Sequence, residues 1–510
     1  MSDAARAADA APRPVTGPRI ARLARQLEAA RDAAARDALT EAFWEGAART
    51  GTPLVEPLDA DPGHRAVTFL WRGHRATRQV LLMATGIGDH GRRADTLLHH
   101  LPGTDVWYLG YRLRADHRGS YRLVADISPG PAPADPALLQ RRLAALTAHG
   151  VADPLNPCRL PVRRRAGESS VFALPEAPAQ PFAGRRPGIR RGAVERHTVA
   201  GRAPGEAREV WTYLPPEGAG LSGAGRHSGA DRSGTGLSGA DRSGSGRPVP
   251  GPLPVLVLCD GGMWFGRLGF QDTLDALIAD GALPPLVVLS PDAEDTGAGG
   301  GGTGAGDAGP RPGEPGGSEA RAALAAFLTD ALLPWARTRW PLTADADRTA
   351  VSGQGVGGTT ALYAALTRPE RFGRVLVQSP APGGPPGDGY RAPGEADRPL
   401  DGRDQALDGL DRTPDGLDRT PDGLDRTPDG LAPGPDGQDR APAGGARSCG
   451  PVVHLALGLH DGAASAEHGA ALVPALRARG HRVVRTVYNG GPDHACWQGL
   501  LADALVAAFR

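Results

Sequence analysis

DRTAVSGQGVGGTTALYAALTRPERFG, residues 347–373, is the stretch on which the fold of the second half of the chain depends. A short β-branched run, a glycine-rich turn and a helix-forming run are typical of a nucleophile elbow, the sharp strand-to-helix turn on which hydrolases present an attacking side chain. The usual pattern Gly-x-Ser-x-Gly has serine at its centre, whereas residues 353–357 read Gly-Gln-Gly-Val-Gly. Gly355 stands at the nucleophile position, so no hydroxyl is available there for covalent attack.

Apolar strands alternate with helical segments on both sides of this turn. The strands are predicted from PVLVLCD, PLVVLS, RTAVSG, RVLVQS, VVHLALG and RVVRTVY, and the helices near 271–279, 319–338, 359–367, 464–479 and 495–509. This alternation indicates an α/β fold with a mostly parallel sheet and helices on both faces. Its ligand site should lie at the carboxyl ends of the strands. The candidates there are the Asp260 turn, the Gly355 turn, Asp461 and the His494 loop.

The first half of the chain has a different pattern. AVTFLWR, TRQVLLMAT, DVWYLGYRL and SYRLVAD are short, β-branched and aromatic, and no long helix separates them. They predict an antiparallel β-sandwich, preceded by a helix within residues 18–48 that packs Ile20, Leu23 and Leu27 on the domain. We therefore divide the chain into an N-terminal helix or tail, a β-sandwich domain and an α/β-hydrolase domain, at residues 1–50, 51–185 and 190–510.

Three low-complexity segments interrupt this organisation. They repeat LSGADRSG over residues 217–247, are rich in Gly, Ala and Pro over 296–317, and carry LDRTPDG three times in tandem within 401–447. Pro and Gly in every copy exclude a coiled coil, and such stretches bury too little apolar surface to offset chain entropy. We expect all three to be disordered inserts.

The bulk composition narrows the class of protein. A formal net charge of +0 lacks the basic field that a general nucleic-acid binder needs. The four cysteines show no paired spacing, which argues against a disulfide framework or a zinc site. The start MSDAARAADAAPRP has no apolar signal region, and no run of about 18 apolar residues occurs. We expect a cytoplasmic protein with no membrane or nucleic-acid partner.

Several motifs, taken together, resemble the enterochelin (enterobactin) esterase family. In the first half these are TGIGDH, GTDVWYLGYRLRADHRGSYRLVAD and VADPLNP. In the second half, LCDGGMWFG, LPPLVVLSPDAEDT, the elbow segment and GGPDHACWQGLL are similar in order and spacing to an esterase-D-like α/β-hydrolase domain. The resemblance implies a cytoplasmic enzyme that hydrolyses ester bonds of ferric catecholate siderophores to release iron.

The resemblance also assigns catalytic positions. Gly355 takes the place of the nucleophilic serine, and Pro492 takes the place of the histidine. The acidic member falls on Ala456 or, a few residues further on, on Asp461. Without two triad members, only the roughly 10³–10⁴-fold assistance of the oxyanion hole and binding remains. We therefore expect impaired or absent serine-esterase turnover.

Nearby side chains are considered as a replacement nucleophile or base. Ser352 lies three residues before the turn, where a strand would direct its hydroxyl into the core. His494 could act as a base for water with Asp461 or Asp493 as its orienter, or it could be a partly exposed loop histidine. Ser379, at the end of another strand, is interpreted as a structural hydroxyl.

Binding features are better retained than catalytic ones. The turn formed by Asp260, Gly261 and Gly262, with the amide of Val356 beyond Gly355, is expected to line an oxyanion hole.

Aromatic and cationic side chains are expected around the same cleft. By the family layout Trp264 and Trp497 would flank it beside Arg267, which suits planar, negatively charged catechol rings. The alternative for each tryptophan is ordinary core packing. No cluster has the ligand spacing of a dedicated metal site, so iron would arrive inside its chelator and no cofactor is expected.

Three hypotheses on function remain open from the sequence. The chain could be a siderophore esterase with weak or unconventional activity through His494. It could be a non-catalytic ferric-siderophore binding or regulatory protein on the same scaffold. It could also be a structural homologue without a ligand.

Overall fold

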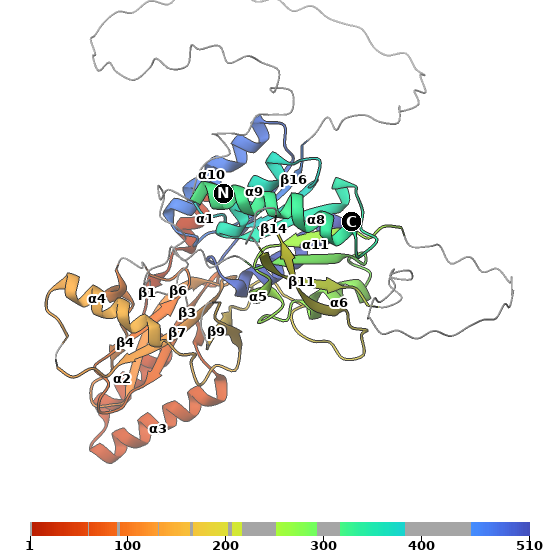
Figure 1. The fold of residues 1–510 in the computed structure, drawn as a ribbon. Coiled ribbons are helices and arrows are strands. Elements are labelled where there is room, and N and C mark those ends of the chain that lie inside the picture. The colour runs from red at the N-terminus through yellow and green to blue at the C-terminus, as the bar shows by residue number, and fades with distance from the viewer. Residues whose placement is uncertain are drawn as a thin grey trace, which may run out of the picture.

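The computed structural model describes residues 3–59, 61–88, 92–130, 132–163, 167–201, 207–216, 251–292, 317–382 and 450–510. The low-complexity segments at 217–247 and 401–447, and that at 296–317 apart from its last residue, lie outside the described residues. The described chain forms a sandwich of two antiparallel sheets followed by a larger sheet covered by helices (Figure 1).

The N-terminal domain is the predicted β-sandwich. One sheet has the order β1-β6-β3-β2, with β5 also paired to β6, and the other has the order β4-β7-β9-β8. Phe69 and Leu113 from the first sheet and Leu82 and Leu123 from the second lie in one buried cluster between the sheets. The strands are β1 (Arg13–Pro14), β2 (Leu54–Pro57), β3 (His64–Arg72), β4 (Gln79–Ala84), β5 (His99–His100), β6 (Val106–Arg114), β7 (Arg118–Asp126), β8 (Arg159–Pro161) and β9 (Glu168–Ala173).

Helices cover the outer faces of this sandwich. Because side chains alternate along a strand, Phe69 faces inward while the next residue, Leu70, packs outward against helices α2 (Pro18–Ala29) and α3 (Ala33–Thr50). Helix α4 (Pro136–Leu146) places Leu143 on the outer face of the second sheet. A further helix, α1 (Asp3–Ala10), begins the chain.

The predicted N-terminal helix is confirmed in its packing but not in its continuity. Ile20, Leu23 and Leu27 are buried as expected. The sequence reading of one helix within 18–48 was wrong, because the chain leaves α2 through an extended Ala30 and restarts at α3. The restart is fixed by Asp32, whose carboxylate accepts a hydrogen bond from Ala35 N–H at 2.8 Å.

The second domain contains an eight-stranded sheet of order β10-β11-β13-β12-β14-β15-β16-β17. The strands predicted from the six apolar runs are all present and parallel to one another, and their helices cover both faces. The sequence did not reveal β10 and β11, which add an antiparallel hairpin at one edge. The strands are β10 (Ala193–Ala200), β11 (Ala207–Leu214), β12 (Val255–Leu258), β13 (Val287–Pro291), β14 (Thr349–Gln354), β15 (Arg374–Gln378), β16 (Val452–Gly458) and β17 (Val483–Tyr488).

Two apolar layers enclose this sheet. One contains Leu362 and Leu472, and the other contains Leu274 and Leu505. The helices are α5 (Gly261–Trp264), α6 (Gln271–Ala279), α7 (Gly317–Phe327), α8 (Leu333–Arg337), α9 (Val356–Thr367), α10 (Ala463–Ala478) and α11 (His494–Phe509), with a π-helical turn (Leu328–Leu332) between α7 and α8.

The two domains meet where β7 lies against the loops that follow β16 and β17. Arg118 N–H donates to the carbonyl oxygen of Asn489 at 3.1 Å. His117 is fully buried at this contact, and its Nδ1 lies 3.2 Å from Asn489 Oδ1. His460 Nε2 lies 2.8 Å from the same oxygen, and the two imidazole rings are 5.1 Å apart. Burial, and secondarily His460, lower the pKa of His117 to about 3.

This interface should make folding stability fall in mild acid. The unfolded chain takes up the His117 proton near pH 6.5, whereas the folded chain resists it down to about pH 3. Stability is therefore lost as the pH falls below about 6.5, by about 2 kcal/mol for this group between pH 7 and pH 5. Denaturant unfolding at both pH values should show that His117→Phe reduces this difference. The exposed His74→Phe is the control, and an unchanged pH difference in His117→Phe would contradict the assignment.

Candidate functional site

The turn between β14 and α9 has the backbone of a nucleophile elbow. Gly355 adopts φ 54° and ψ −122° at the end of the strand, and its N–H donates to Gln378 O at 3.1 Å. A side chain in this conformation is strained, and glycine accepts it at little cost. A Cβ built on Gly355 meets no atom within 4 Å, so the turn faces open space.

Close packing explains the glycines that flank the turn. A Cβ on Gly353 would lie 2.2 Å from Gly357 O, so strand and helix approach each other too closely for any side chain. Ser352, just before them, is fully buried in β14, as its position in a strand predicted, and does not face the open space at Gly355.

Polar side chains link the turn to its surroundings beneath the sheet. Trp264 Nε1 donates to Gln354 Oε1 at 3.0 Å, and Gln354 Nε2 donates to Gln378 Oε1 at 2.7 Å. Gln378 is 1% exposed and ends β15. The hydrogen bonds from Trp264 and to Gln378 thus hold the side chain of Gln354, the residue before Gly355, from two sides.

The Asp260 turn lies at the end of the neighbouring strand. Asp260 has φ 76° and forms an ion pair with Arg163 of the N-terminal domain. Among the described residues, Asp260 and Ser379 are the two non-glycine residues with positive φ, and both follow strands next to β14. Backbone strain of this kind concentrates at functional sites.

The proposed oxyanion donors differ in availability. Gly262 N–H donates to a carboxylate oxygen of Asp292, so in this structure it is already engaged. Gly261 is packed so closely that a Cβ there would lie 2.3 Å from Ser290 O. Val356 is the first residue of α9, where the amides have no partner within the helix, and it is 41% exposed.

The loop that carries Pro492 lies beside Asp461. Tyr488 OH donates to Gly491 O at 2.9 Å, and its oxygen lies 3.4 Å from Asp461 Oδ1. Asp461 Oδ2 accepts from Gly458 N–H at 2.8 Å. Burial raises the pKa of Asp461 to about 6. Pro492 itself is exposed.

Ala456 and Asp461, the two positions considered for the acidic member, lie in different surroundings. Ala456 is buried within β16, whereas Asp461 follows the carboxyl end of that strand next to the Pro492 loop. Ser379 Oγ lies 2.7 Å from Tyr488 OH and accepts from Trp497 Nε1 at 3.0 Å, which agrees with its predicted structural role.

The two tryptophans belong to the core. Trp264 is fully buried and Trp497 is 6% exposed, and each donates its indole N–H to a protein oxygen. The expectation that they flank an open cleft is thus not met, and the alternative of core packing describes both. Arg267 is exposed, and its Nη1 donates to Val162 O of the N-terminal domain at 2.6 Å.

His494 lies between these indole rings. Its ring centroid is 5.5 Å from that of Trp264 and 4.9 Å from that of Trp497, both in edge contacts. Asp493, one of its predicted orienters, uses Oδ1 to accept from Ala495 N–H at 2.9 Å and Oδ2 to accept from Ser120 N–H at 2.6 Å. That carboxylate therefore caps α11 and joins the domains.

Sequence reasoning missed three polar residues of this region. Asp292 directly follows β13, so the strand-end rule that selected Asp260 would have found it. Gln378 is a polar residue at the end of an apolar run, which is a detectable signal. Tyr488 was read as part of a strand, and nothing in the sequence marks its hydroxyl as a link to Asp461.

Other features of the described residues limit the chemistry. No group of three or more His, Cys, Asp or Glu side chains among them is arranged to hold a metal ion. No helix in the described part of the chain is long and apolar enough to cross a membrane.

Fold and site together define a class, a β-sandwich joined to an esterase-type α/β-hydrolase domain. The family described as "Enterochelin esterase, N-terminal" matches residues 66–183, and "Putative esterase" matches residues 244–402. The crystal structure of ferric enterobactin esterase from Salmonella typhimurium superposes with a TM-score of 0.60 at 23% identity, over 92% of this chain and 98% of that one. The enterobactin esterase of Shigella flexneri, in the presence of enterobactin, gives 0.59 at 23% identity, over 92% and 97%.

Sequence relatives identify the family. The iron(III) enterobactin esterase of Dickeya dadantii is 34% identical over 355 residues, which cover 66% of this chain and 71% of that protein. The iron(III) salmochelin esterase of Escherichia coli O6:H1 is 32% identical, over 71% and 75%. The chain belongs to the enterobactin (enterochelin) esterase family, which confirms the resemblance predicted from its motifs.

Asp493→Ala should destabilise the whole chain by about 2–4 kcal/mol, because it removes a helix cap and leaves the Ser120 amide unpaired in a buried contact. Chemical denaturation measures the change. Asp135→Ala is the matched control, since Asp135 caps α4 in the same way on the surface and should cost only about 1 kcal/mol. Equal effects of the two substitutions would show that the contact between the domains contributes nothing.

Proposed function

We propose that this chain binds ferric catecholate siderophores on the enterobactin esterase scaffold without forming an acyl-enzyme intermediate. Gly355 carries the proposal, because it keeps the elbow backbone and faces open space but supplies no attacking oxygen. The names of the relatives support the ligand class, and iron would enter as part of that ligand. No cofactor of the protein's own is needed for this role.

The residues around Gly355 support binding without covalent chemistry. The Val356 amide offers a hydrogen-bond donor at the helix start. By the family resemblance Asp461 would be the triad acid, but Pro492 next to it has neither a base nor a donor for it to orient. A siderophore ester could thus be held at the turn and not attacked by the protein.

Slow hydrolysis by activated water is the second candidate. His494 is the candidate base, and its ring contacts Trp264, whose indole N–H donates to Gln354, the residue before Gly355. The two carboxylates that could orient this ring are engaged elsewhere. Asp493 accepts two backbone amides, and Asp461 accepts from Gly458 N–H and lies beside Tyr488 OH. We therefore rank hydrolysis by activated water below binding without turnover as the function of this chain.

Calorimetric titration with a ferric catecholate triester, together with chromatography of the same mixture, separates these functions. We expect saturable binding and no release of monomer. Val356→Trp should weaken binding about tenfold or more by filling the space beside the turn. Val55→Trp is the control, since Val55 is 40% exposed on the other domain. Monomer release that His494→Ala abolishes would favour the water mechanism, and absence of binding would leave a structural homologue without a ligand.

Restoring both missing groups tests whether the rest of the site persists. Gly355→Ser with Pro492→His should gain triester hydrolysis, measured by monomer release, with Asp461 as the acid. Each single substitution should remain inactive, because a triad acts as a unit. Serine at this positive φ should also lower the unfolding free energy by about 1–3 kcal/mol. A folded double variant without activity would show that the pocket has lost its catalytic geometry.

A further inference from the structure

The N-terminal domain contains a cavity that the siderophore site does not use. It has a volume of about 320 Å³ and lies between helix α3, the end of strand β3 and the loop at residues 153–155. Figure 1 shows α3 at the end of this domain that is remote from the eight-stranded sheet. The loop belongs to the VADPLNP motif, which the site around Gly355 leaves unexplained.

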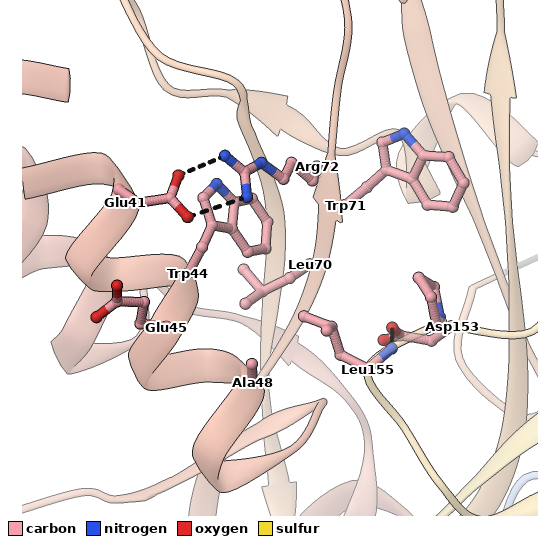
Figure 2. A pocket seen from close by; sticks show the side chains of 10 residues that line it. Glu41, Trp44, Glu45, Ala48, Leu70, Trp71, Arg72, Asp153 and Leu155 are labelled. Atoms are coloured by element: carbon pink, nitrogen blue, oxygen red, sulfur yellow. Dashed lines mark hydrogen bonds and ion pairs between the residues drawn. The ribbon is translucent and has the colours of Figure 1, made fainter. Parts of the chain in front are cut away.

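The floor of the cavity is apolar and aromatic. Trp44 and Leu70 are nearly fully buried, and Leu155 is half-buried opposite them (Figure 2). Trp44 is held in place by its indole N–H, which donates to Asp105 at 2.7 Å. A fixed ring and two leucines suit a small apolar body, and the volume is at the lower end of ordinary ligand sites.

The rim of the cavity is acidic. Glu41 and Glu45 stand one turn apart on α3, on the same face as Trp44 and Ala48. They give the lining two exposed carboxylates against one guanidinium, that of Arg72. The carboxylate of Asp153 is buried and accepts from Tyr121 OH and Leu155 N–H, so it is not part of the rim.

The single cationic side chain of the lining, that of Arg72, already forms ion pairs with carboxylates of the protein. Arg72 Nη2 lies 2.6 Å from Glu41 (Figure 2). Its Nε lies 2.8 Å from Asp105. These contacts raise the pKa of Arg72 further above its ordinary value. Among the described residues, Glu45 forms an ion pair with the exposed Arg49 at 3.9 Å, and such a surface pair contributes little in water. The cavity thus offers a weakly matched carboxylate above an apolar floor.

We propose that this cavity binds a small organic ammonium ion, with its apolar body against Trp44, Leu70 and Leu155 and its charge beside Glu45. Carboxylates and aromatic rings are the groups that recognise such cations. An anionic catecholate complex is disfavoured by the same charges, so the ligand differs in class from that of the Gly355 site. The proposal for this cavity and the proposed function at the Gly355 site can therefore be tested independently of each other.

Three probes of similar shape and different charge test the ligand class on the full chain. Calorimetry with 2-phenylethylammonium, 2-phenylethanol and 3-phenylpropionate at pH 7 should show one saturable site for the ammonium ion. The alcohol should bind about threefold to tenfold more weakly and the carboxylate not measurably. Failure of the ammonium ion to saturate, or equal binding of the carboxylate, would overturn the proposal.

Paired substitutions locate the site. Ala48→Trp fills the cavity and should abolish binding, whereas Ala42→Trp lies on exposed α3 surface outside the lining and should not. Glu45→Gln should weaken ammonium binding about threefold or more, while Asp37→Asn on the same helix should leave it unchanged. If Ala48→Trp does not fold, the comparison of Glu45→Gln with Asp37→Asn still tests the proposal. Unaltered ammonium binding in Glu45→Gln would contradict the proposed contact.

Discussion

The carboxylate of Asp493 joins parts of the chain that are more than 370 residues apart in sequence. One oxygen caps the last helix through Ala495 N–H, and the other accepts Ser120 N–H from the N-terminal sandwich. Burial raises the pKa of this carboxyl, and the amide donors act against that effect. The residue also directly follows Pro492, so the backbone of this loop is held in place from the other domain. The sandwich is thus part of the framework of the site.

Most of the fold could be predicted from the sequence because its signals are local. Apolar strands such as VVHLALG and the elbow turn carry their patterns within a few residues. The hairpin of β10 and β11 was missed although its strands alternate polar and apolar residues, because they lack the continuous apolar runs by which the buried parallel strands were recognised. The break between α2 and α3 was missed because an N-cap at Asp32 was read as an ordinary helical polar residue.

The candidate site was harder to derive, because its contacts join distant segments. The positions of Gly355 and Pro492 followed from motifs, and Asp461 from the end of a strand. The engagement of Gly262 by Asp292 and the burial of Trp264 could not be read from spacing, since both depend on packing between strands that are far apart in sequence. A sequence can mark a glycine turn, but it does not state which amides remain free.

The glycines of the turn before α9 answer to different physical limits, which matters for engineering. A Cβ at Gly355 meets no atom within 4 Å, so the cost of a side chain there comes from the backbone, which has φ 54°. At Gly353 a Cβ would lie 2.2 Å from Gly357 O, so the cost there is a direct overlap of atoms. A designer can therefore add a functional group at the first position by accepting local strain, whereas the second position admits none unless strand and helix move apart.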